Sequence, residues 1–167
     1  MDNSNKVKWD SRINPPTITD IRNVEEFFDV KFPQDYILCV LENHGGKPYP
    51  NRLDIGSNDA TSFGELLTFD PTSKIYIPEK YNRISEELPD GIIPFANDPG
   101  GNYICFDYKN GKQDEPIIVF WDHELSVSED DLSEEELEEK SLEEYQREAI
   151  VPICSTFTEL LSKLYTK

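Results

Sequence analysis

The side chains best suited to covalent chemistry are three cysteines and two histidines. Cys39 and His44 invite interpretation as a nucleophile and its base, because a thiolate is activated by a nearby imidazole. His44 follows Cys39 by five positions, and helical residues face each other at spacings of three or four. Cys39 also lies in an apolar segment that a core would bury. We therefore predict no catalytic residues here, and an unrecognised enzyme remains only an alternative.

A second polar group ends the apolar run at residues 117–121, where Asp122, His123 and Glu124 follow Trp121. Neighbours on a strand point to opposite faces, so adjacency alone does not make their side chains converge. The chain also lacks the His-x-x-x-His and His-Glu-x-x-His spacings of metal sites. We expect these residues to anchor a turn, and we predict neither a metal nor a cofactor.

The glycines of Asp98-Pro99-Gly100-Gly101-Asn102 could suggest a phosphate-binding loop. That loop needs a lysine and a serine or threonine before a helix, and this segment has neither. Glycine allows positive φ, while aspartate and asparagine hydrogen-bond nearby backbone. The segment therefore predicts a tight turn between strands.

Helical periodicity predicts the elements at both ends of the chain. Residues 19–29 place Ile21, Val24, Phe27 and Phe28 on one face. A second helix begins at Pro33 and ends at Gly45-Gly46, since proline suits a first turn and glycine a helix end. A last helix follows Thr156, which has capping-box spacing to Glu159, and extends to Leu164.

Between these helices the pattern favours short strands and turns. Expected strands cover residues 53–57, 66–69, 74–77, 92–96, 103–108 and 117–121, with a short helix over 79–87. This order predicts a single α+β domain whose antiparallel or mixed sheet is flanked by N-terminal and C-terminal helices. Residues 1–16 are expected to form an arm that Trp9 holds against the core, and 17–167 the domain.

Charge excludes several classes of partner. The net charge is −18, and residues 129–148 supply half of it, with eleven acids against two bases. Such a surface repels nucleic acid and anionic membranes but attracts basic proteins; improved solubility is the simpler alternative. We expect 129–148 to be a partly helical excursion, with a mobile loop as the other possibility.

Targeting signals are not evident in the sequence. No run approaches the roughly 20 apolar residues of a membrane helix, and residues 1–10 lack the apolar stretch of a secretory signal. Three widely spaced cysteines, with no Cys-x-x-Cys, favour buried thiols in a reducing compartment. We therefore expect a cytoplasmic protein.

The order of several motifs resembles one known family. The motifs are Phe32-Pro33-Gln34-Asp35-Tyr36, the segment 42–48 containing Asn43, Gly45 and Gly46, the segment 93–102 containing Asp98, Gly100, Gly101 and Asn102, Ile104–Asp107, Val119–Glu124 and Phe157–Leu164. In this order they resemble the SUKH superfamily of Smi/Knr-type domains over residues 17–165. Residues 129–148 are longer and more acidic than the family pattern leads us to expect.

The resemblance implies a binding protein. Similar bacterial proteins are mostly cytoplasmic immunity proteins that neutralise a cognate toxin domain, often a nuclease; the alternative is a regulatory scaffold in cell-wall or signalling pathways. We expect a monomer or weak dimer, and Tyr49, Tyr81 and Tyr145 are possible aromatic anchors. The predicted partner-binding carboxylates are Asp122, Glu124, Glu129, Asp130, Asp131, Glu134, Glu135, Glu136, Glu138 and Glu139. The family residues predicted to be structural are Pro33, Tyr36, Asn43, Gly45, Gly46, Asp98, Gly100, Gly101, Asn102, Asp107 and Trp121.

Overall fold

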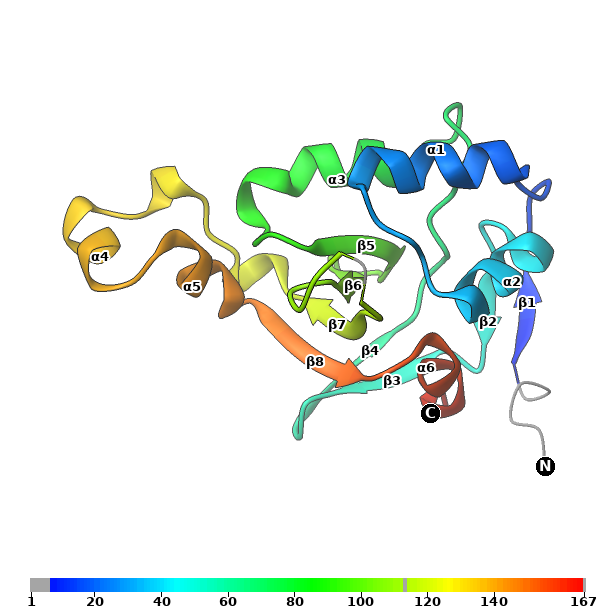
Figure 1. The fold of residues 1–167 in the computed structure, drawn as a ribbon. Helices are drawn as coiled ribbons and strands as arrows, with labels where there is room; N and C mark the ends of the chain where they lie inside the picture. The colour runs from blue at the N-terminus through cyan, green and yellow to red at the C-terminus, as the bar shows by residue number, and fades with distance from the viewer. Residues whose placement is uncertain (1–6, 113, 167) are drawn as a thin grey trace.

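A computed structural model describes residues 7–112 and 114–166, and Figure 1 shows its arrangement of helices around a sheet. The helices are α1 (Ile18–Phe28), α2 (Gln34–Asn43), α3 (Ile77–Ile84), α4 (Glu134–Glu139), α5 (Leu142–Arg147) and α6 (Phe157–Lys163). The strands are β1 (Lys8–Asp10), β2 (Lys47–Tyr49), β3 (Arg52–Ile55), β4 (Asp59–Ser62), β5 (Ile92–Asn97), β6 (Tyr103–Asp107), β7 (Ile117–Trp121) and β8 (Ile150–Cys154). The predicted α+β class is confirmed.

The central sheet is antiparallel, with its four strands in the order β5-β6-β7-β8. Side chains alternate across it, so Ile104 and Phe106 join the main hydrophobic cluster while Cys105 joins a second cluster on the other face. Val119 and Trp121 also belong to that second cluster. Both faces are therefore buried, which explains why β5 to β7 are apolar almost throughout. The expected strands at 92–96, 103–108 and 117–121 are confirmed.

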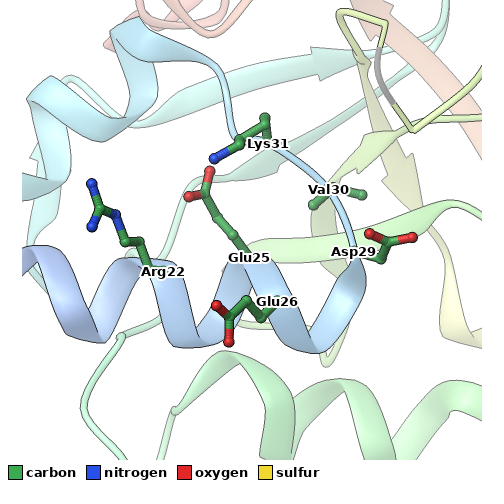
Figure 2. A pocket seen from close by; sticks show the side chains of 6 residues that line it. All are labelled: Arg22, Glu25, Glu26, Asp29, Val30 and Lys31. Carbon is green, nitrogen blue, oxygen red and sulfur yellow. The ribbon is translucent and has the colours of Figure 1, made fainter.

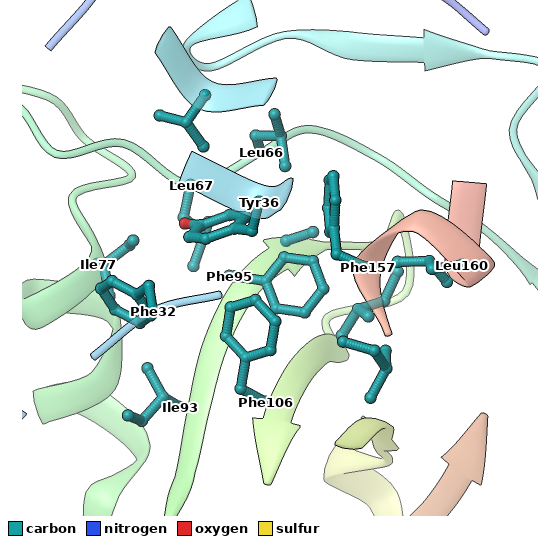
Figure 3. Packing of buried hydrophobic residues seen from close by; sticks show 14 of the residues in the cluster. Phe32, Tyr36, Leu66, Leu67, Ile77, Ile93, Phe95, Phe106, Phe157 and Leu160 are labelled. Carbon is teal, nitrogen blue, oxygen red and sulfur yellow. The ribbon is translucent and has the colours of Figure 1, made fainter. Parts of the chain in front are cut away.

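Tyr36 of α2 lies at the centre of the main cluster (Figure 3). Its ring is fully buried, and its centroid lies 4.9 Å from that of Phe106 and 5.4 Å from that of Phe157 of α6. These edge-to-face contacts join α2, α6 and the sheet in one aromatic core. The Tyr36 hydroxyl has no hydrogen-bond partner among residues 7–112 and 114–166.

The first helix corrects one sequence prediction. The buried residues of α1 are Ile21, Val24 and Glu25, whereas Phe27 is 50% exposed. Positions 21, 24, 25 and 28 form the inward stripe, and Phe27 lies beside it. Glu25 can occupy an inward position because its carboxylate accepts a hydrogen bond from the backbone N–H of Phe32 at 2.8 Å.

The middle of the chain differs more from expectation. Residues 66–69 and 74–77 make only isolated bridges, Leu66 with Ala96 and Thr68 with Tyr76, so the strands predicted there are wrong. The hairpin of β3 and β4 is real, although its second strand was not predicted. The short helix expected over 79–87 is α3 followed by a 3₁₀ turn at Ser85–Glu87.

Part of the predicted N-terminal arm is ordered. Residues 1–6 lie outside the described residues, but β1 pairs with β2 in an antiparallel ladder. Trp9 packs edge-on against Phe63, with their centroids 6.1 Å apart, as expected for a residue that holds this segment to the core.

Candidate functional site

The acidic segment 129–148 forms a projection beyond the end of the sheet, drawn in yellow and orange in Figure 1. It contains a 3₁₀ turn at Glu129–Asp131 followed by α4 and α5, so the partly helical prediction is confirmed. Each of its three turns or helices begins with a capping box, from Ser128 to Asp131, Ser133 to Glu136 and Ser141 to Glu144. Helices of six residues are too short to be stable alone, and the caps supply hydrogen bonds that the helix ends lack.

The projection is fastened to the body at its base. Arg147 donates two hydrogen bonds to the carboxylate of Asp107, the last residue of β6, and one to the carbonyl of Asp90. The Asp107 side chain is only 2% exposed, so this ion pair lies largely outside solvent. Gln146 is also buried and donates to the carbonyl of Glu86 at 2.9 Å. These contacts link the acidic segment to the sheet and to the turn after α3.

The predicted partner-binding carboxylates of this segment divide into two groups. Asp131 and Glu136 accept hydrogen bonds from the backbone N–H of Ser128 and Ser133, so their charges stabilise helix starts. The exposed carboxylates without such a cap are Glu129, Asp130, Glu134, Glu135, Glu138 and Glu139. The second group therefore contains more carboxylates, and none of them is engaged in a capping box.

Asp122 and Glu124 lie where β7 passes into the projection. Asp122 is half-buried, and its carboxylate accepts a hydrogen bond from the backbone N–H of Glu124 at 3.0 Å. Glu124 is exposed in the 3₁₀ turn His123–Leu125. Asp122 therefore stabilises a turn, and Glu124 is the freer of the two charges.

The glycine turn forms a hydrogen-bonded network with His123. Asp98 accepts from the backbone N–H groups of Gly100 and Asn102, and Asn102 Oδ1 lies 2.7 Å from His123 Nδ1. Gly101 has a φ of +87°, and a Cβ there would lie 3.4 Å from the His123 ring. The segment is a tight turn between β5 and β6, and the residues after β7 anchor it.

The remaining family residues have contacts typical of turns and packing. Asn43 donates to the carbonyl of Cys39 at the end of α2, and Gly45 has a φ of +68°. A Cβ on Gly46 would lie 2.8 Å from the Asn43 carbonyl oxygen. Pro33 precedes the first turn of α2, as the sequence predicted for the start of this helix.

The landmarks from Pro33 to α6 extend over the body of the protein, and a family model tests their order. The model of the SMI1 / KNR4 family (SUKH-1) matches residues 15–163. The chain belongs to this family. It also resembles the SPbeta prophage-derived uncharacterized protein YokK of Bacillus subtilis (strain 168), with 51% identity over 47 residues. That match covers 28% of this chain and 22% of YokK.

In this SMI1/KNR4-family chain the reactive side chains are dispersed. His44 is buried, with Nδ1 2.7 Å from the Asn14 carbonyl oxygen and Nε2 accepting from the backbone N–H of Phe69 at 2.8 Å. Both of its nitrogens are therefore occupied by backbone groups. Burial raises the pKa of Cys39 and of Cys154 to about 11, and burial also raises that of Cys105, so the thiolate is disfavoured. Within the described ranges, no cluster of three potential metal ligands occurs.

Two surface hollows are lined by charged side chains. One, of about 200 Å³, lies along α1, where Arg22, Glu25 and Lys31 are among its lining residues (Figure 2). The other, of about 340 Å³, lies beside Asp54, Pro152 and Lys163. Each has charges of both signs without a convergent set of donors or acceptors. Among the helices of residues 7–112 and 114–166, none has the length and apolarity to cross a membrane.

The sequence interpretation missed the residues that position the acidic segment. Arg147 was counted only as one of two bases, although it binds a buried aspartate 40 positions away. No local pattern reports such a contact. The capping boxes, in contrast, were readable as Ser-x-x-Asp and Ser-x-x-Glu spacings within the acidic run.

Proposed function

We propose that this protein is an immunity protein that binds and neutralises a cognate toxin domain, and that its partner is a basic nuclease. Membership of the SMI1/KNR4 family supports a binding role, because bacterial members of this kind are commonly immunity proteins. The observation that carries the proposal is the ordered projection, on which Glu134, Glu135, Glu138 and Glu139 are exposed, while its ion pairs with Lys140 and Arg147 involve the other carboxylates Glu148 and Glu143. A cationic partner would be attracted to it by charge complementarity.

The nuclease part rests on electrostatics. A nuclease must hold a phosphate backbone in a positively charged cleft, so a dense field of carboxylates can occupy the same cleft. Glu134, Glu135, Glu138 and Glu139 are held on one short helix whose start is fixed by Ser133 and Glu136. Pre-organisation of this kind lowers the entropy lost on binding.

The proposal places the protein in the cytoplasm of the producing bacterium, as a monomer or weak dimer whose domain occupies residues 17–167. We infer that it acts without catalysis. This is supported by His44 being bound to backbone on both nitrogens and by thiols whose pKa values are raised. A turnover by the purified protein that is lost on changing His44 or His123 would contradict this inference.

The deciding experiment is co-expression with the product of an adjacent toxin gene in the source genome. Host survival that depends on this protein is the expected result, and binding of the purified pair should weaken steeply from about 50 to 200 mM salt. Affinity unchanged across the salt series would remove the electrostatic part. Absence of a neighbouring toxin gene and of any protection would favour the alternative regulatory scaffold.

A further inference from the structure

The surface of the α1–α3 layer carries an aromatic triad of Phe27, Phe28 and Tyr81. The Phe27 and Phe28 centroids are 4.9 Å apart, those of Phe28 and Tyr81 are 5.0 Å apart, and both pairs are close to perpendicular. Phe27 is 50% exposed, whereas Val24 and Glu25 of the same helix are buried. A half-exposed phenylalanine leaves apolar surface in water, which is unfavourable, whereas a polar residue at this position would not.

The exposed ring is held by rigid neighbours. Phe28 packs against the main hydrophobic cluster, and Tyr81 packs against the second cluster on the other face of the sheet. Phe27 contacts both rings, with its centroid 6.3 Å from that of Tyr81. A ring fixed in this way loses little conformational freedom when a partner covers it, which is the property of an interface anchor.

Negative charge borders the triad. Glu26 is exposed next to Phe27, and its side chain extends from α1 toward α3 in Figure 2. Burial and then the carboxylate of Asp90 raise the pKa of Tyr81, which places a second negative charge near this ring. Of the two bases on the same helix, Arg83 is ion-paired with Glu79 at 3.1 Å and Lys80 is half-buried. Aromatic faces bordered by carboxylates suit a guanidinium group, which stacks on rings and binds carboxylates.

The helix that carries Tyr81 leads to the base of the acidic projection. The 3₁₀ turn after α3 begins at Ser85; in it the Glu86 carbonyl accepts from Gln146 and the Glu87 carboxylate accepts from Ser126. Tyr81 precedes Glu86 by five positions, which corresponds to roughly 8 Å along a helix. A protein interface of ordinary size, about 800 Å² on each partner, can cover the triad and the base of the projection.

We propose that the aromatic triad is the anchor at which an arginine-bearing surface of the basic toxin docks, next to the acidic projection. The inference rests on the proposed function and adds the second part of the interface. The projection speeds encounter through its charge, whereas the triad slows dissociation through desolvated contact. Of the three tyrosines predicted as possible anchors, the triad contains Tyr81. Tyr145 is used internally, with its hydroxyl donating to the Glu136 carbonyl.

The test compares Phe27→Ser with Leu38→Ser, a matched control on α2, because Leu38 is 55% exposed. The probe is the catalytically inactive domain of the toxin encoded beside this gene, and binding kinetics are measured by surface plasmon resonance. Phe27→Ser is expected to weaken binding roughly 10- to 100-fold, mainly through faster dissociation. Leu38→Ser should leave the affinity within about threefold of wild type, and thermal melting of both variants checks that they fold.

Each outcome is informative. Unchanged affinity of Phe27→Ser, with wild type binding the toxin domain, would overturn the anchor and leave the proposed function standing. No binding by wild type would overturn both together. Sedimentation velocity addresses a second copy of this chain as the occupant: a wild-type dimer that Phe27→Ser converts to a monomer would overturn the toxin-docking assignment.

Discussion

At the scale of single residues, the two histidines have opposite environments. His44 bridges the carbonyl of Asn14 and the backbone N–H of Phe69 in the interior, and so connects the N-terminal segment to α2 and to the loop before α3. His123 is exposed, and its ring contacts Asn102 of the glycine turn. A buried polar group left without a partner costs more than an exposed one, because water replaces the lost bond only at the surface.

The contrast predicts unequal effects of removing the two imidazoles. His44→Ala should lower the free energy of unfolding by about 2–4 kcal/mol, since the buried backbone N–H of Phe69 loses its partner, the carbonyl of Asn14 loses a second bond and the buried ring leaves a cavity. His123→Ala should lower it by about 1 kcal/mol or less. Urea unfolding followed by tryptophan fluorescence measures both values. Equal losses would contradict the assignment of His44 as the buried bridge.

The thiols predict a characteristic pH dependence. The pKa of Cys39 and of Cys154 is about 11, compared with an ordinary 9.0, because burial disfavours the thiolate. At pH 8 their reaction with a disulfide reagent should be roughly 100-fold slower than that of a free cysteine, and the rate should rise about tenfold per pH unit.

The folded state binds these thiol protons more tightly than the unfolded state. The corresponding stability is therefore fully present below about pH 9 and is lost as pH rises toward about 11.

Native-state labelling between pH 7 and pH 10 measures this dependence, with the urea-unfolded protein as the control. Cys105 is buried in the second cluster and should react only on unfolding. A thiol that reacts rapidly at pH 7 would instead indicate an activated nucleophile.

At the scale of elements, Arg147 attaches the projection to the sheet through Asp107. Arg147→Ala leaves Asp107 charged and buried, so it should cost about 2–4 kcal/mol and speed hydrogen exchange in α5. The control is Lys140→Ala, which removes the same charge from an exposed pair with Glu148 and should cost about 0.5 kcal/mol or less. Similar effects of the two variants would show that the ion pair does not fasten the segment.

The last strand of the sheet was not predicted because proline interrupts its apolar run. The backbone N–H of Asp122 bonds to the Ala149 carbonyl, and β7 and β8 then pair Phe120 with Val151 and Val119 with Pro152. Hydrogen-bonded and non-hydrogen-bonded pairs alternate, so the nitrogen of Pro152 points away from β7. Proline is tolerated there because β8 is an edge strand.

This geometry predicts that Pro152 suppresses strand pairing between molecules. Pro152→Val would restore an outward N–H to the edge of the sheet, and it should raise self-association in sedimentation velocity at high protein concentration. Val151→Thr on the same strand keeps Pro152 and serves as the control. A monomeric Pro152→Val protein would remove this role from the proline.

How far the sequence predicted the fold depends on how local the deciding contacts are. The helix starts at Pro33 and Thr156, the turn at Gly100-Gly101 and the apolar strands β5 to β7 are set within a few residues, and all were predicted. Glu25 was not expected inside, since its partner is the backbone of Phe32 across a loop. The acidic segment was recognised by composition, but its attachment through Arg147 depends on a distant strand. The aromatic triad likewise joins two helices.

At the scale of the whole molecule, charge and stability are separated in space. Half of the net charge of −18 is on residues 129–148, outside the aromatic core. Repulsion among these carboxylates therefore acts on short capped helices, which contribute few buried residues, and not on the sheet. The protein can therefore vary the projection without changing the core that carries it.

This separation predicts that neutralising free carboxylates changes binding kinetics and leaves stability nearly unchanged. The triple variant Glu134→Gln, Glu135→Gln and Glu138→Gln should lower the association rate with the toxin domain about tenfold at 50 mM salt and reduce its salt dependence, with little change in dissociation. The control changes the same number of exposed acids elsewhere, as Asp10→Asn, Glu42→Gln and Glu115→Gln. Each variant neutralises three of the 34 acidic residues, so both change the net charge from −18 to −15. Equal slowing by both variants would mean that overall charge, rather than the projection, steers the partner. Slowing by the first alone, with faster dissociation in Phe27→Ser, would assign encounter to the carboxylates and retention to the aromatic triad.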